Sequence, residues 1–354
     1  MDEQLLFSGT QEVSKDREID VDSLQAFMEE AVAGFSGSLD VREYRGGQSN
    51  PTYSLTAGGK RYVMRRKPPG PILKSAHAVD REYKALTALA VSSVPVPRTY
   101  ALCIDESVIG TWFYIMDHVD GRIFWENSLP GLDPESRTAI YNSMIETLAA
   151  LHRVDHISVG LEDFGKPSDY VARQLKRFVG QYELDETQKI PEMTKLAEWL
   201  LANIPADQPP VIVQGDFKLA NLVLHHDRPE VIGVLDWELS TIGNPIADLA
   251  CHCMPYHLGA DTHGGMEHLD LASLGIPSEE DHLNAYCAAV GLNEIPDWDY
   301  YMAFVLFRNA QISLGILARA EKGTASSDHA SAMGARAWPY SKAAWGMAQR
   351  ADTR

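Results

Sequence analysis

Two neighbouring segments decide how the chain folds: VIVQGDFKLANLVL (211–224) and VIGVLDWE (231–238). The first begins with a short apolar run that predicts a strand, and Asp216 follows in the loop where this strand ends. Asn221 comes five positions later, before a second apolar run. The second segment, 231–238, predicts a strand that forms a hairpin with this second run and ends at Asp236. The pattern therefore predicts two carboxylates and one carboxamide at the same end of a small sheet.

This set of side chains is typical of phosphoryl transfer. One Asp orients an attacking hydroxyl and accepts its proton, while an Asn and a second Asp hold Mg²⁺ against nucleotide phosphates. The catalytic loop of kinases has the same Asp-to-Asn interval and is followed downstream by a metal-binding Asp. Taken singly, Asp216 and Asn221 are more often turn formers, and Asp236 is more often a helix cap, than catalytic residues. A strand and a Glu-bearing helix lie upstream in the expected order, and this order favours the functional interpretation.

The segment upstream predicts a small antiparallel sheet. Its β-like runs span residues 39–45, 52–56, 61–66 and 112–116. Glycine pairs at 46–47 and 58–59 are hairpin signals between the first three runs. Helical spacing of apolar residues predicts helices over 22–32 and 75–90. The first twenty residues are polar and lack periodicity, so we expect a mobile arm there.

Beyond residue 121 the pattern is mostly helical. Helices are predicted over residues 135–153, 170–182, 193–202, 279–290, 301–321 and 330–350. Pro339 is expected to kink or interrupt the last of them. The prediction is an α+β, bilobal chain with a small antiparallel-β N-terminal lobe (1–117) and a larger, mostly helical C-terminal lobe (118–354). The cleft between two such lobes is the natural ligand site.

Composition excludes several classes of protein. The chain has 354 residues, with 31 basic and 49 acidic side chains and a formal charge of −18. This acidic balance argues against a nucleic-acid or anionic-membrane binder. We find no secretory leader and no apolar run of about 18 residues, so we expect a cytoplasmic protein without a membrane span. The spacing of Cys251, His252, Cys253 and His257 matches no common zinc site, and buried thiols are the favoured interpretation.

Two motifs carry a resemblance to a known superfamily. QGDFKLAN (214–221) looks like an H-G-D-x-x-x-x-N loop, and LDWE (235–238) looks like a metal-binding I/L-D-W-E/D segment. The chain therefore resembles the aminoglycoside phosphotransferase and choline kinase-like superfamily of small-molecule kinases. GGQSNPTY (46–53), RRKPPG (65–70) with SAHAVDREY (75–83), and LDWELSTIG (235–243) resemble the branch that also occurs fused to acyl-CoA dehydrogenase domains. The resemblance covers about residues 39–327.

The resemblance implies a protein kinase-like fold and a role for each matching residue. Asp216 matches the catalytic Asp, and Asn221 and Asp236 match the Mg²⁺ ligands. Arg65 falls where kinases place the basic residue of the third strand. Arg66 and Lys67 are rivals for this role, and strand alternation puts Lys67 on the same face as Arg65. Glu82 falls where the helix-borne partner of that base belongs, and an exposed helix carboxylate is the equal alternative.

Two further segments match nucleotide contacts of the family. Gly47, Ser49 and Asn50 belong to the loop over the phosphates. Met116, Asp117 and Val119 match the hinge, where backbone groups meet the adenine edge and Met116 is the gatekeeper. Asp248 matches a residue that braces the catalytic loop.

The sequence departs from the family at Gln214, where a histidine is usual. Glutamine also donates and accepts hydrogen bonds, so we expect the loop to keep its shape. The prediction is an ATP- and Mg²⁺-dependent O-phosphotransferase whose partners are a nucleotide and a small hydroxylated acceptor, either aminoglycoside-like or a metabolite such as a hydroxyacyl thioester. A catalytically silent binding protein is the alternative. Candidate acceptor-pocket residues are Tyr256, His257, His282, Tyr286, Arg308, Asn309 and Gln311.

Overall fold

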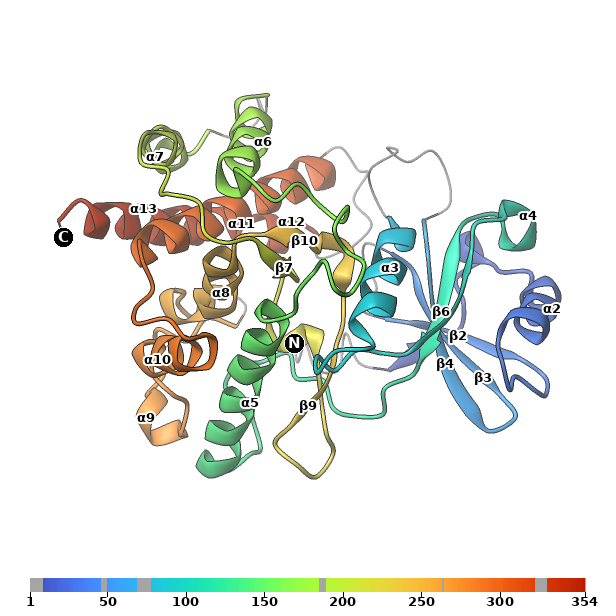
Figure 1. Cartoon of the computed structure of the whole chain (residues 1–354). Helices are drawn as coiled ribbons and strands as arrows, with labels where there is room; N and C mark the ends of the chain where they lie inside the picture. Colours follow the sequence, from blue (N-terminus) through green and yellow to red (C-terminus); the bar gives the residue numbers. More distant parts are fainter. Residues whose placement is uncertain are drawn as a thin grey trace. The chain divides into compact units, whose positions relative to one another are not determined.

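The chain divides into two compact units. The computed structural model describes residues 9–45, 50–68, 78–184, 189–262, 264–321 and 330–353, without the side chain of Asp16. Unit 1 comprises residues 1–125 and 222–240, and unit 2 comprises residues 126–221 and 241–354 (Figure 1). The short segment 222–240 thus groups with the N-terminal part of the chain.

Unit 1 is built on a six-stranded sheet in which all neighbouring strands are antiparallel. Its order is β1-β2-β3-β4-β6-β5, with β1 at Thr10–Gln11, β2 at Asp40–Tyr44, β3 at Thr52–Ala57, β4 at Lys60–Arg66, β5 at Thr99–Cys103 and β6 at Phe113–Asp117. The four strands predicted from the sequence are confirmed to within two residues. The sequence analysis did not predict β5, a five-residue strand that begins two residues after Pro97.

The hairpin between β3 and β4 has the turn that its glycine pair predicts. Ala57 pairs with Lys60, so Gly58 and Gly59 form a two-residue loop, with φ angles of 56° and 79°. Two positive φ angles in a row favour glycine and match the twist of the strands. A Cβ atom on Gly58 would also lie 2.5 Å from the carbonyl oxygen of Ser36.

The expectation of a mobile N-terminal arm is wrong for residues 9–20. Thr10 pairs with Tyr44, which adds β1 to the edge of the sheet. The carboxylate of Glu43, only 2% exposed, accepts hydrogen bonds from Ser14 and forms an ion pair of 2.6 Å with Arg17. A buried carboxylate needs such donors, and the arm supplies them. Residues 1–8 lie outside the described part of the chain.

Helices cover the sheet of unit 1. They are α2 (Val21–Ala31), α3 (Val79–Leu89) and the short α4 (Glu106–Ile109), with a 3-10 turn, η1, at Lys15–Arg17. Leu24 and Met28 of α2 are buried in a core with Tyr62, Met64 and Ile115 of the sheet. The predicted helix over 22–32 is confirmed. The one predicted over 75–90 is confirmed from residue 79, and residues 75–77 lie outside the described range.

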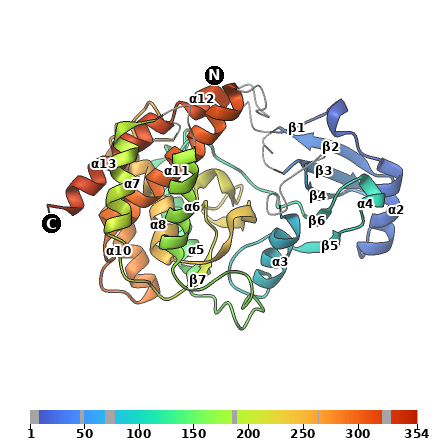
Figure 2. The same cartoon turned by 90° about the horizontal axis from the view of Figure 1, so that it is seen from above.

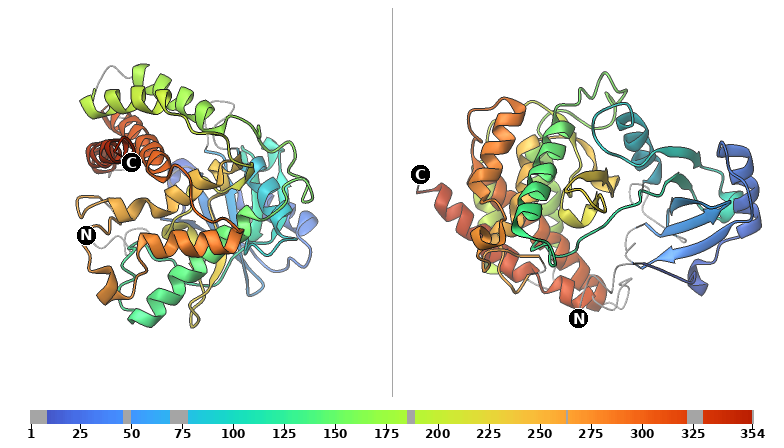
Figure 3. Two further views of the ribbon diagram at one scale, coloured as in Figure 1. Left: turned by 60° about the vertical axis from the view of Figure 1, so that its left-hand side comes forward. Right: turned by 90° about the horizontal axis from the view of Figure 1, so that it is seen from below.

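Unit 2 is mostly helical. Its helices are α5 (Pro134–His152), α6 (Tyr170–Leu184), α7 (Pro191–Ala202), α8 (Pro245–Cys253), α9 (Leu271–Leu274), α10 (Glu279–Val290), α11 (Trp298–Glu321), α12 (Ala330–Gly334) and α13 (Ala337–Ala351), with 3-10 turns η2 (Leu219–Asn221) and η4 (Met254–His257). In it, α13 runs along α11 (Figure 2), and α10 packs on α5 (Figure 3). Five predicted helices are confirmed, and the sixth divides into α12 and α13. Pro339 lies in the first turn of α13, where proline is tolerated.

The longest helix of unit 2 is the core of that unit. Its stretch from Tyr301 to Phe307 is 0% exposed at every position. By length and composition alone α11 could cross a membrane, but 67% of its most apolar window is buried within the protein. An apolar helix that is buried on all sides is typical of a protein core.

The sequence suggested one small sheet in the β-rich segment 211–243, but its strands form two separate pairs. In unit 2, β7 (Val211–Val213) pairs with β10 (Thr241–Gly243), whereas in unit 1 β8 (Leu222–Leu224) pairs with β9 (Val231–Val234). The 3-10 turn η3 (Trp237–Leu239) follows β9. The sequence reading missed β10, because its three residues give too short a run for an alternating pattern to register.

Candidate active site

Arg65 of β4 lies among carboxylates in unit 1. Its Nε atom is 3.3 Å from Oε2 of Glu82 on α3, and its Nη2 atom donates to Oδ1 of Asp236 at 3.0 Å. Glu82 is fully buried, so the alternative of an exposed helix carboxylate is wrong. Strand β4 and helix α3 thus bring together a base and an acid that lie 17 positions apart in the sequence.

Asn50 completes this group, which we call the Arg65 cluster (Arg65, Glu82, Asp236 and Asn50). The Asn50 side-chain amide donates to Oε1 of Glu82 at 2.7 Å and lies 3.4 Å from Oε2 of Glu238. The Tyr114 hydroxyl donates to the other oxygen of Glu82 at 3.0 Å. Asn50 is 1% exposed and is the last residue of the predicted phosphate loop. The end of that loop is therefore anchored to α3. Gly47 and Ser49 lie outside the described residues.

The charges of the Arg65 cluster depend on one another. Burial opposes the charge of Arg65, but Glu82 and Asp236 outweigh it and raise the pKa of the guanidinium. Burial raises the pKa of the Glu82 carboxyl, and Arg65 opposes this rise. Removing one partner would leave an uncompensated charge in a buried place.

Asp236 has a backbone conformation that turns the chain sharply after β9. Its φ and ψ angles are 59° and 67°, in the left-handed region that Asp adopts more readily than most residues. Trp237, buried and donating from its ring N–H to the carbonyl of Val234, anchors the next turn. The Asp236 side chain remains 34% exposed.

Arg66 and Lys67, the two alternatives to Arg65, contact other groups. Arg66 donates to the carbonyl oxygen of Arg17 at 2.8 Å, and its guanidinium lies over the ring of Tyr53. The ammonium of Lys67 lies 3.8 Å from the ring centroid of Trp112. Of these three basic residues, only Arg65 is placed by the structure beside Glu82 and Asp236.

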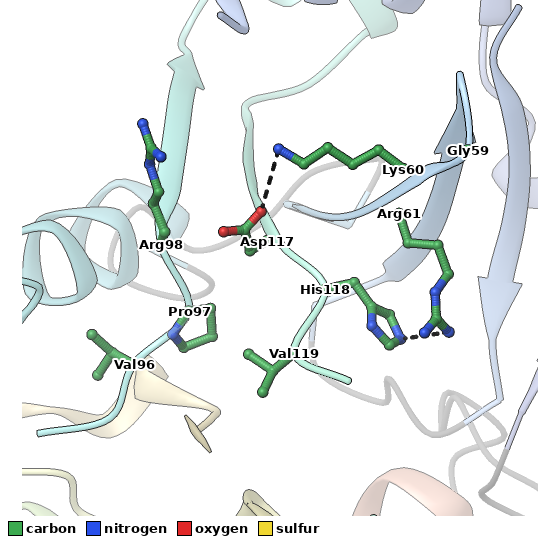
Figure 4. A pocket seen from close by; sticks show the side chains of 9 residues that line it. All are labelled: Gly59, Lys60, Arg61, Val96, Pro97, Arg98, Asp117, His118 and Val119. Carbon is green, nitrogen blue, oxygen red and sulfur yellow. Dashed lines mark hydrogen bonds and ion pairs between the residues drawn. The ribbon is translucent and has the colours of Figure 1, made fainter. Parts of the chain in front are cut away.

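The predicted hinge begins with Met116 and Asp117, the last two residues of β6. Met116, 6% exposed, pairs with Val63 of β4, and Asp117 and Val119 continue the chain. The side chains of these last two residues line an open cavity of about 550 Å³ (Figure 4). The ammonium of Lys60 forms an ion pair with Asp117 at 3.8 Å, and the Tyr100 hydroxyl donates a hydrogen bond to the same carboxylate. Gly59, Arg61, Val96, Pro97, Arg98 and His118 complete the cavity wall.

Asp216 lies in unit 2, in a loop we call the Asp216 loop (residues 214–221). Its carboxylate pairs with Lys218 at 2.7 Å and accepts from the Asn221 amide at 3.1 Å. The same amide donates to the backbone carbonyl of Asp216 at 2.9 Å. Phe217 and Leu219 between them are buried, so the loop alternates anchoring apolar residues with polar ones.

Buried polar groups hold the backbone of this loop. Asp248 of α8 accepts from the N–H groups of Gln214 and Gly215, both at 2.8 Å, which confirms its predicted bracing role. Gln214 is fully buried, and its Oε1 atom accepts from the N–H of Asp216 at 2.7 Å. Asn244 caps α8 through the N–H groups of its first turn and thereby fixes where Asp248 lies.

Sequence reasoning missed helix α8 and a polar chain that ends on Asp248. The Nε2 atom of His152 lies 3.3 Å from Asp248, and its Nδ1 atom lies 2.6 Å from the hydroxyl of Tyr286. The dipeptide Asn244-Pro245 was the available signal for α8, because Asn at the cap followed by Pro is typical of a helix start. No local pattern identifies His152, because its partners lie 96 and 134 positions away.

Most candidate acceptor-pocket residues are held inside unit 2. His282 is 1% exposed and stacks on His252 with a centroid distance of 5.3 Å. Burial lowers the pKa of both rings, that of His282 to about 4. His257 contacts Glu279 at 2.6 Å, and Tyr256 donates to the carbonyl of Pro277. Gln311 is 5% exposed, whereas the half-buried Asn309 donates to the carbonyl of Val305.

Comparison with known proteins identifies relatives that are longer than this chain. It is 40% identical over 349 residues to acyl-CoA dehydrogenase family member 10 of Mus musculus, covering 98% of this chain and 33% of the relative. It is 41% identical to acyl-CoA dehydrogenase family member 11 of Homo sapiens, covering 91% of this chain and 42% of that protein. The chain therefore spans about a third to two fifths of these relatives.

Solved structures show the same fold. A putative aminoglycoside phosphotransferase from Ralstonia eutropha is 45% identical, with a TM-score of 0.86, and the match covers 94% of this chain and 99% of that one. An aminoglycoside phosphotransferase, APH(4)-Ia, solved with ADP and hygromycin B, is 16% identical with a TM-score of 0.57 over 91% of this chain and 98% of that one, which shows the fold alone. The model of the phosphotransferase enzyme family matches residues 40–281. The chain has the bilobal fold of these enzymes, and it belongs to the phosphotransferase enzyme family.

Proposed function

We propose that the protein transfers the γ-phosphoryl group of ATP to a hydroxyl of a small molecule and requires Mg²⁺. The observation that carries this proposal is the Asp216 loop, in which the Asn221 amide holds the carboxylate and the backbone carbonyl of Asp216. The chain passes from Asn221 directly into β8, whose first residue pairs with Val234, two residues before Asp236. This order supplies the acid, amide and acid that phosphoryl transfer needs.

The donor atoms suit Mg²⁺. The Asn221 side chain uses its nitrogen toward Asp216, so its carbonyl oxygen is the atom left for coordination. Asp236 offers a partly exposed carboxylate, and Mg²⁺ prefers such oxygen ligands. The bound Mg²⁺-nucleotide supplies the transferable phosphoryl group and offsets the charge on it.

The other residues have roles in binding and orientation. In the proposal, Asp216 orients the acceptor hydroxyl and accepts its proton. Arg65, already aligned by Glu82, contacts phosphate oxygens through its forked guanidinium. Backbone groups of Asp117 and Val119 meet the adenine edge, with Met116 behind them. Gly47, Ser49 and Asn50 contribute the loop over the phosphates.

For the acceptor we favour a hydroxylated metabolite such as a hydroxyacyl thioester. The support is the 40–42% identity to proteins named acyl-CoA dehydrogenases, of which this chain matches only a part. An aminoglycoside is the other candidate, supported by the 45% identical structure described as a putative aminoglycoside phosphotransferase. Both acceptors carry the hydroxyl group that the proposed chemistry requires.

The test combines an acceptor screen with one substitution. The protein is incubated with Mg²⁺-ATP and a panel of hydroxyacyl thioesters, free hydroxy acids and aminoglycosides, and products are searched for a mass gain of one phosphoryl group. We expect Asp216→Ala to abolish this gain, whereas Asp227→Ala, at an exposed position in the turn between β8 and β9, keeps it. Nucleotide binding by wild type without any transfer or slow hydrolysis would favour a catalytically silent binding protein instead.

A further inference from the structure

Arg308 of α11 reaches the backbone next to Asp216. Its Nη2 atom donates to the carbonyl oxygen of Gly215 at 2.9 Å and lies 3.2 Å from the sulfur of Cys251. The sequence suggested Arg308 as an acceptor-pocket residue. Arg308 is only 7% exposed, so it is poorly placed for that role. It lies beyond residues 40–281, to which the family model applies.

The contact is made to one particular peptide group. The carbonyl of Gly215 and the N–H of Asp216 belong to the same planar unit. Arg308 binds the carbonyl side of this unit, and Gln214 accepts from its N–H side at 2.7 Å. The preceding peptide is held by Asp248, and Gly215 between them has a φ angle of 87°. Both edges of the peptide that leads into Asp216 are therefore fixed by buried side chains.

A buried arginine is a costly way to fill a core. No carboxylate of a described residue forms an ion pair with Arg308, yet its charge interacts with Cys251, Asp216 and Asp248. Transfer of a guanidinium from water is unfavourable, and an apolar residue of similar volume usually serves packing as well or better. Arg308 donates to the peptide group that leads into Asp216, and this position gives a functional reason for its buried charge.

We propose that Arg308 is a positioning residue for Asp216. It fixes the plane of the Gly215–Asp216 peptide and so the direction in which the Asp216 carboxylate leaves the loop. Small misplacements of a catalytic group have large effects on rate. The inference rests on the proposed phosphotransferase function, in which Asp216 is the group to be placed.

The kinetic test uses two variants and a matched control. Arg308→Met keeps the length of the side chain without a donor, and we expect turnover to fall at least about a hundredfold. Arg308→Lys keeps one donor and should recover at least tenfold of that loss. Affinity for the nonhydrolysable analogue AMP-PNP should stay within threefold of wild type in both. Arg137, whose guanidinium also binds two backbone carbonyls of unit 2, is the control, and Arg137→Met should keep wild-type turnover.

A spectroscopic test does not depend on the acceptor. The carbonyl carbon of Gly215 and the amide nitrogen of Asp216 are labelled with ¹³C and ¹⁵N, and their NMR shifts are compared among the same variants. We expect both resonances to move in Arg308→Met, to return partly in Arg308→Lys and to stay in place in Arg137→Met. Arg308→Lys also keeps the test decisive if Arg308→Met does not fold.

Three results would overturn the proposal. These are unchanged resonances in folded Arg308→Met, unchanged turnover per folded molecule, or a loss of nucleotide affinity that accounts for the loss of rate. An inert wild type would instead refute the proposed function, and the resonances would still show whether Arg308 holds the peptide.

Discussion

The Arg65 cluster of unit 1 and the Asp216 loop of unit 2 hold their functional side chains in opposite ways. In the cluster, the charged side chains bind one another directly, with Glu82 between Arg65 and the Asn50 amide. In the loop, buried side chains bind the backbone, and the Asp216 carboxylate pairs with Lys218 and accepts a hydrogen bond from Asn221. A change in the cluster should therefore affect stability and ligand binding together, whereas a change at the loop should separate the two.

The largest expected effect on stability is at Glu82. Glu82→Ala removes the main partner of buried Arg65 and the acceptor that lies 2.7 Å from the Asn50 amide. Breaking such a buried pair costs roughly 3–5 kcal/mol of unfolding free energy. Urea titration measures this change. Glu230→Ala breaks the exposed pair with Arg228 and should change stability by less than about 1 kcal/mol. Similar values for the two variants would refute the contrast drawn here.

The next effect concerns pH and the stacked histidines of unit 2. His282 has a pKa of about 4 in the folded protein because of burial, against about 6.5 when exposed. Between these values the unfolded chain binds more protons than the folded one, so stability is full above pH 6.5 and falls as pH drops toward 4. The loss from this one group is on the order of 3 kcal/mol.

The histidine prediction is checked by comparing the wild type with a variant that lacks His282. Unfolding free energies are measured from pH 7.5 to 4.5 for wild type and for His282→Gln, which does not titrate. Carboxylates titrate in both proteins, so the wild type should lose stability more steeply. Parallel curves would show that His282 is not held neutral by burial.

A smaller effect is expected on ligand affinity at Asp236. Asp236→Asn keeps an oxygen that can accept from Arg65 but removes a charge from the proposed Mg²⁺ site. We expect Mg²⁺-ATP to bind at least about tenfold more weakly, or by about 1.4 kcal/mol, while ATP without Mg²⁺ changes little. Calorimetry with and without Mg²⁺ measures this difference, and Asp227→Asn serves as the control. Equal affinities in variant and wild type would remove Asp236 from the proposed site.

The smallest effect is expected at Gln214, where the family usually has histidine. Gln214 accepts from the N–H of Asp216, and an imidazole nitrogen can accept the same hydrogen bond. Turnover of Gln214→His should therefore stay within about tenfold of wild type, or roughly 1.4 kcal/mol of barrier. The two proteins are compared on any accepted substrate, or on slow ATP hydrolysis. An inert wild type beside an active variant would favour the silent binding protein.

Elements with local signals could be predicted from the amino-acid sequence. The glycine pair at 58–59 predicted its hairpin, because only positive φ angles close a two-residue turn there. The spacing of Asp216 and Asn221 predicted their shared loop, since five residues leave the two side chains within reach of each other. Apolar periodicity likewise predicted most helices of unit 2, but not the shorter α8 and α9.

Contacts between distant segments could not be predicted in this way and are seen in the folded chain alone. Arg308 was predicted as a pocket residue, but it lies behind Gly215, 93 positions away in the sequence. The N-terminal arm was expected to be mobile, but the buried Glu43 draws it onto the sheet. In both cases a buried polar group must find its partner, and the need for hydrogen bonds away from water selects that partner by spatial proximity, which no local pattern encodes.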